Sequence, residues 1–76
     1  MKITLEYELE DDKRWIAEAP QWPGVLAYGA SKEEAGARAK ALTLRVIADK
    51  IENGEFKPTF EFISFETPSD EQLALS

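Results

Sequence analysis

The sequence predicts an α+β domain with the element order β-β-β-α-β, in which one helix packs on a face of an antiparallel sheet. Three observations support this. Apolar and polar residues alternate along residues 2–9, a helix-capping signal begins at Ser31, and an aromatic run at residues 59–66 follows the helical segment. Since 76 residues make one small domain, we expect one folded unit over residues 1–66 and a loose tail over residues 67–76.

A hairpin of two strands is expected at the start of the chain. The odd-numbered residues from Ile3 to Leu9 are apolar and their even-numbered neighbours are polar or charged, which is the pattern of a strand with one wet face. A second strand over residues 14–19 follows the charged turn at residues 10–13. This spacing is typical of an antiparallel hairpin.

A rigid corner leads from this hairpin into the helix. Pro20 and Pro23 fix two backbone φ angles, and a third short strand is expected over residues 25–29. Ser31 and Glu34 then form a capping box. We expect the Ser31 hydroxyl to accept from the N–H of Glu34, and the Glu34 carboxylate to reach back to the N–H of Ser31.

The helix is expected over residues 32–53. Asn53 and Gly54 form a stop signal, and Pro58 shows that the helix has ended. A fourth strand over residues 59–66 follows. Its aromatic residues point to both sides, so we expect both of its faces to be covered.

Two apolar stripes run along the helical segment when residues are placed about 100° apart. The stripe with core-facing spacing consists of Ala35, Ala39, Leu42 and Val46. A second set lies on the far side: Ala37, Ala41, Leu44, Ala48 and Ile51, with Ile47 nearest to it. A helix on one sheet needs a single stripe. The second is therefore either alanine-rich surface, since alanine favours helices and tolerates water, or a contact with another chain.

Composition disfavours several classes of function. The chain has no histidine and no cysteine, so it lacks the commonest general base, the strongest nucleophile and the usual zinc ligands. It also lacks a phosphate-binding glycine-rich loop and a nucleophile-elbow motif. The acidic turn residues do not have the spacing of an EF-hand loop. We expect no enzymatic activity, no cofactor and no metal site.

The charge balance points to a protein partner. With 15 acidic and 9 basic residues the net charge is −6, which disfavours nucleic acid and suits a basic protein. No apolar run is long enough for a signal peptide or a membrane helix. We therefore expect a cytoplasmic protein.

Several motifs, taken in order and spacing, resemble the HicB antitoxin family. An acidic turn precedes the segment Trp15-Ile16-Ala17-Glu18-Ala19-Pro20, and Pro23-Gly24-Val25 completes the corner. The helix opens with the segment Gly29-Ala30-Ser31-Lys32-Glu33-Glu34-Ala35. The similarity covers residues 3–53.

The resemblance implies a partial RNase H-like fold and a role in a type II toxin–antitoxin pair. In that role the chain binds a small basic HicA toxin, an mRNA-cleaving RNase, and covers its active site. It also implies a homo-oligomer, either a dimer or a tetramer. The alternative is a stand-alone oligomeric structural or regulatory module with no toxin. We expect the helix, with Trp22 nearby, to cover the toxin's active site, and the homo-oligomer to form through the second stripe or an edge strand. The residues expected to contact the toxin are Trp22, Glu33, Glu34, Ala37, Ala41, Leu44, Arg45 and Ala48.

Three features depart from the family pattern. Lys13 stands where the hairpin turn often has glycine. Gly36 stands where a larger apolar residue is usual, and would cost about 1 kcal/mol relative to alanine in an exposed helix. The chain ends at Ser76 without the DNA-binding domain that many members carry, so we expect no direct nucleic-acid contact. The metal-binding acids of a nuclease cannot be matched.

Overall fold

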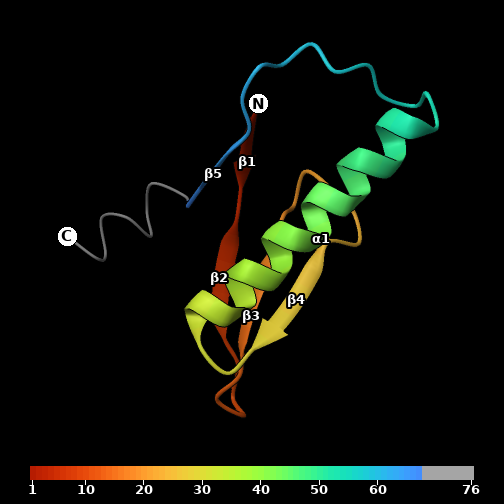
Figure 1. Cartoon of the computed structure of the whole chain (residues 1–76). Coiled ribbons are helices and arrows are strands. Elements are labelled where there is room, and N and C mark those ends of the chain that lie inside the picture. Colours follow the sequence, from red (N-terminus) through yellow and green to blue (C-terminus); the bar gives the residue numbers. More distant parts are fainter. Residues whose placement is uncertain (68–76) are drawn as a thin grey trace.

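The structure has one helix on one face of an antiparallel sheet, as predicted (Figure 1). It is a computed structural model that describes residues 1–67. The elements are β1 (Lys2–Thr4), β2 (Glu6–Leu9), β3 (Trp15–Glu18), β4 (Leu26–Gly29), α1 (Lys32–Glu52) and β5 (Ser64–Glu66). The α+β class is confirmed. Apart from Thr67, the predicted tail lies outside the described residues.

The strands form two sheets, an antiparallel one in the order β2-β3-β4 and a parallel pair, β1-β5. The strand predicted over residues 2–9 is divided at Leu5, whose N–H donates to the Glu66 carbonyl at 2.8 Å. Across the antiparallel sheet Tyr7 pairs with Ala17, and Ala17 with Ala27. This row of side chains faces α1, because successive residues of a strand point to opposite faces.

The hairpin turn uses Lys13 in a conformation that usually selects glycine. Its φ is +73°, and its N–H donates to the Glu10 carbonyl at 3.0 Å. A left-handed residue after a tight turn is a common way to close a hairpin. For a residue with a side chain this conformation costs about 1–2 kcal/mol. The hairpin turn therefore closes in a left-handed conformation at Lys13 without a glycine.

Residues with little or no side chain bring α1 close to the sheet. A Cβ on Gly29 would collide with the backbone N of Ala35. A Cβ on Gly36 would lie 2.7 Å from the Tyr7 hydroxyl oxygen. Ala35 and Ala39 are fully buried between the two layers. The glycine at position 36 is thus buried against β2, where an added Cβ would require the Tyr7 ring to shift.

The buried face of α1 is rotated from the predicted stripe. Its buried residues are Ala35, Gly36, Ala39, Thr43 and Ile47. Leu42 and Val46 are only half-buried. Thr43 is tolerated there because its hydroxyl donates to the Ala39 carbonyl at 2.7 Å. The placement of Ile47 near the second stripe is wrong, since only 3% of that residue is exposed.

The predicted capping box is present at the start of α1, but one of its two hydrogen bonds has a different donor. Ser31 Oγ accepts from the Glu34 N–H at 3.1 Å, as predicted. The Glu34 carboxylate accepts from the Ala30 N–H at 3.3 Å, instead of the predicted Ser31 N–H. The helix ends at Glu52, one residue before the predicted end, where Asn53 caps it.

The predicted fourth strand is wrong over residues 59–63. Only Ser64–Glu66 pairs, in parallel with β1. The preceding aromatic residues pack instead of pairing: the Phe60 ring stacks on the Phe56 ring with centroids 6.0 Å apart. Phe62 is 80% exposed, so the two faces of this segment are not both covered. Contacts of the aromatic rings at the C-terminal end of α1 override the strand propensity of the run.

Gly29→Ala is expected to lower the free energy of unfolding by about 3 kcal/mol, because the backbone at the start of α1 must shift to admit a methyl group. Gly54→Ala is the matched control. It has open space around it and a φ of +74°, so its cost is about 1 kcal/mol. Urea unfolding of both variants measures the difference, and equal losses would contradict the close contact at Gly29.

Candidate functional site

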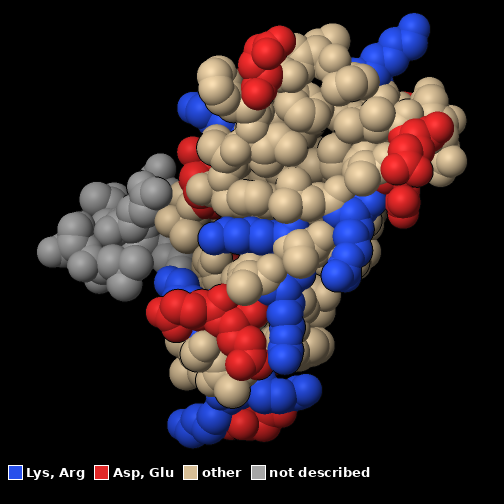
Figure 2. All heavy atoms as spheres, viewed as in Figure 1, with Lys and Arg blue, Asp and Glu red and all other residues tan. Residues whose placement is uncertain are grey.

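The outward face of α1 carries an apolar stripe that no described element covers. This outer stripe consists of Ala37, Ala41, Leu44 and Ala48, all of them exposed. Leu44 is 43% exposed, although leucine is usually buried. Figure 2 views this side of the molecule, where a broad area over the upper part of α1 carries no charged side chain. The sequence-predicted second stripe is therefore solvent-facing over residues 37–48, with exposed Arg45 beside it, whereas its last member, Ile51, is half-buried and packs against the core.

The two acidic candidates at the start of α1 have different surroundings. Glu34 caps the helix and pairs with Arg38 at 3.1 Å. Arg38 in turn donates to the Tyr28 carbonyl at 2.9 Å, on the outer edge of β4. Glu34 therefore ties the helix to the sheet. Glu33 is exposed and lies one helical turn before Ala37.

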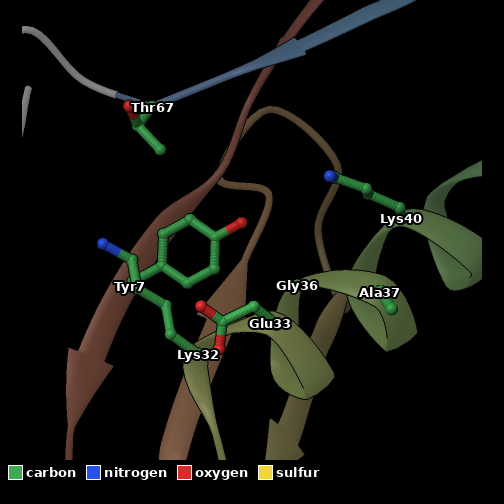
Figure 3. A pocket seen from close by; sticks show the side chains of 7 residues that line it. All are labelled: Tyr7, Lys32, Glu33, Gly36, Ala37, Lys40 and Thr67. Atoms are coloured by element: carbon green, nitrogen blue, oxygen red, sulfur yellow. The ribbon is translucent and has the colours of Figure 1, made fainter.

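A hollow of about 550 Å³ opens beside Glu33 and Ala37, between α1 and β2 (Figure 3). Its other lining residues are Tyr7, Lys32, Gly36, Lys40 and Thr67. The Lys32 ammonium lies 4.9 Å from the Tyr7 ring centroid and 5.8 Å from that of Trp15. These are cation–π contacts, so the Lys32 charge lies against the aromatic side chains beneath α1.

Trp22 lies away from the other candidates. It is half-buried, and its ring meets the Phe56 ring edge-on at a centroid distance of 6.0 Å. Phe56 follows the C-terminal end of α1, whereas Glu33 and Ala37 lie at its start. The structure therefore brings the outer stripe residues together but separates them from Trp22, which closes the far end of the core.

A second uncovered surface lies on the opposite side of the molecule. We call it the open sheet face: the side of β2-β3-β4 that points away from α1. Its side chains are Glu6, Glu8, Ile16, Glu18, Leu26 and Tyr28. Leu26 is 40% exposed and Tyr28 is 39% exposed. A hollow of about 220 Å³ lies over Ile16, among the three glutamates.

The open sheet face carries three exposed carboxylates, those of Glu6, Glu8 and Glu18. Glu6 lies directly opposite Glu18 in the strand register, and like charges in that position are destabilising. Within residues 1–67 neither of them, nor Glu8, forms an ion pair. By contrast, Asp12 in the hairpin turn accepts from the backbone N–H of Arg14, which holds the pKa of Asp12 below its ordinary value.

The open sheet face was missed at the sequence level, although part of its signal was present. Alternation placed Glu6 and Glu8 on a wet face. The position of Glu18 opposite Glu6 depends on the hairpin register, and the turn at Lys13 sets that register. The exposure of Leu26 depends on which face α1 covers.

Comparisons of the chain with protein-family models, with curated proteins and with solved structures gave no match. Residues 1–67 contain no helix that is both long and apolar enough to cross a membrane. In the same part of the chain, no three His, Cys, Asp or Glu side chains are grouped so as to hold a metal ion.

Leu44→Ala is expected to change the free energy of unfolding by no more than about 0.5 kcal/mol, because the side chain lies on the surface. Ile47→Ala, three residues further along, is expected to cost about 3 kcal/mol because it leaves a cavity in the core. Chemical denaturation of the two variants tests this assignment of the helix faces. A larger loss of unfolding free energy for Leu44→Ala than for Ile47→Ala would mean that Leu44, and not Ile47, faces the core.

Proposed function

We propose that this protein is the antitoxin of a type II toxin–antitoxin pair, which binds a small basic HicA-type RNase and inhibits it by covering its active site. The main support for the proposal is that the domain is acidic, with net charge −6, and has exposed apolar side chains on two faces, the outer stripe and the open sheet face. Exposed apolar side chains gathered in this way mark protein-binding surfaces. The motifs from Trp15 to Ala35 that resemble the HicB family supply the identity of the partner.

Charge supports a basic partner. A negative protein attracts a positive one before contact, and this raises the association rate. The same charge opposes binding to RNA or DNA phosphates, so we propose that the chain contacts the toxin and not nucleic acid. The proposed role is binding without catalysis. An mRNA-cleaving toxin acts where mRNA is translated, and we place the antitoxin with it in the cytoplasm.

We also propose that the chain is a homo-oligomer assembled through the outer stripe. Alanine side chains let a second helix approach closely, and Leu44 gives an apolar anchor. The edge of β4 is a poorer choice, because Arg38 already occupies the Tyr28 carbonyl there. Glu34 and Trp22 stabilise the domain itself, so we do not assign them to this interface.

The outer stripe also suits the alternative function, a stand-alone oligomeric structural or regulatory module. The two functions differ in the genes they require. An adjacent reading frame for a small basic protein favours the antitoxin, and its absence favours the module.

The purified chain is expected to bind the small basic protein encoded beside it and to stop its cleavage of mRNA. Calorimetry measures the binding, and cleavage of an mRNA fragment at increasing antitoxin concentration measures the inhibition. Glu61→Gln, on the exposed loop before β5, is the control and is expected to leave both unchanged. If the wild-type chain neither binds nor inhibits that protein, the antitoxin function is wrong.

Leu44→Glu is expected to dissociate the homo-oligomer while leaving the domain folded, because the new charge falls in an apolar interface and not in the core. Sedimentation velocity at micromolar concentration reports the assembly, and circular dichroism reports the fold. A wild-type chain that sediments as a monomer would contradict the proposal. So would equal loss of assembly and fold.

A further inference from the structure

We propose that the open sheet face is the docking surface for the basic partner, which leaves the outer stripe of α1 for a second copy of this chain. The inference rests on the proposed function and adds the location of the partner. The occupant is a protein surface that carries Lys or Arg side chains around an apolar patch.

The part of the open sheet face along the edge strand β4 is apolar. Ile16 and Tyr28 are register neighbours on β3 and β4, and Leu26 lies two residues from Tyr28 on the same face. Leu26 and Tyr28 are each about two-fifths exposed. The Arg14 guanidinium lies over the Tyr28 ring at 4.5 Å from its centroid, at one end of the patch. Tyrosine and arginine are enriched among the few residues that supply most of the affinity at protein interfaces.

Carboxylates on β2 and β3 lie beside this apolar part. Glu6 and Glu18 are register neighbours, and Glu8 lies two residues along β2 on the same face. All three are exposed, and within residues 1–67 none of them has an ion-pair partner. In the isolated domain the opposed pair repels. A partner that places cations between these carboxylates turns that repulsion into attraction, so the arrangement is favourable only in a complex.

The same charges argue against the other occupants. Two copies of this face would place six carboxylates against each other, so it is unsuited to a symmetric dimer. Nucleic acid is excluded because its phosphates have the same sign. The outer stripe has the opposite character, since alanines and Leu44 carry no charge and two stripes meet without repulsion. The two faces therefore suit different partners.

The test compares two triple variants that remove the same charge. The sheet-face variant is Glu6→Gln with Glu8→Gln and Glu18→Gln. The matched control is Asp49→Asn with Glu52→Gln and Glu61→Gln, at exposed positions away from the face. Calorimetric binding of the basic protein encoded beside this chain is measured at two salt concentrations. The sheet-face variant is expected to weaken binding about tenfold or more, with a smaller salt dependence, and the control about threefold or less.

A charge-neutral variant and a folding readout complete the test. Leu26→Ser leaves the charge unchanged and is expected to weaken binding about tenfold, because it removes apolar contact area from the β4 side of the face. The sheet-face triple variant is expected to melt at a higher temperature than the wild type, since the Glu6–Glu18 repulsion is gone. Loss of binding through misfolding would lower the melting temperature.

The outcomes separate this inference from the function on which it rests. If the wild-type chain does not bind the basic protein, the antitoxin function and the inference both fail. If it binds and inhibits, but the two triple variants weaken binding equally, the function stands and the sheet face is not the docking surface. The same conclusion follows if Leu44→Glu abolishes binding while the sheet-face variant does not. Binding of a single-stranded RNA through this face would also overturn it.

Discussion

The close contact between α1 and the sheet is the constraint on which the rest of the structure depends. At Gly29 and Ala35 the two backbones nearly touch, and at Gly36 the Tyr7 ring lies against the helix. Only residues without bulky side chains allow this approach, so the core between the layers is thin and rich in alanine. A helix held this way can bury only one side. Both its outer stripe and the far face of the sheet are left to solvent.

The sequence predicted those features that depend on neighbouring residues alone, namely the first strands and the two ends of the helix. Alternation gave the strands, and the Ser31 cap and the Asn53-Gly54 stop gave the helix to within one residue. Features that depend on the fold were not predictable. The buried face of α1 rotated to include Thr43, because the hydroxyl finds the Ala39 carbonyl within the same helix. The aromatic run before β5 packed at the end of α1 instead of pairing. For the candidate site, the outer stripe was visible in the sequence, whereas the open sheet face required the strand register.

The two uncovered faces differ in the chemistry of their side chains. The outer stripe is neutral and built from small residues with one leucine, which suits contact with an identical surface. The open sheet face combines apolar side chains with three glutamates, one pair of which is placed where it weakens the isolated sheet. Departures from local stability often mark sites that serve binding. We therefore propose that one small domain uses separate surfaces for self-association and for a basic partner.

The proposal that the open sheet face binds the partner is tested by mapping, residue by residue, which part of this chain contacts the partner. Amide chemical shifts of the labelled chain would be recorded with and without the basic protein encoded beside it. We expect the changes in chemical shift to concentrate in β2, β3 and β4, with Glu6, Glu18 and Tyr28 among the most affected residues. The shifts of residues 37–48 of α1 are expected to remain unchanged. Shifts concentrated on the outer stripe, or none at saturating partner, would contradict the proposal.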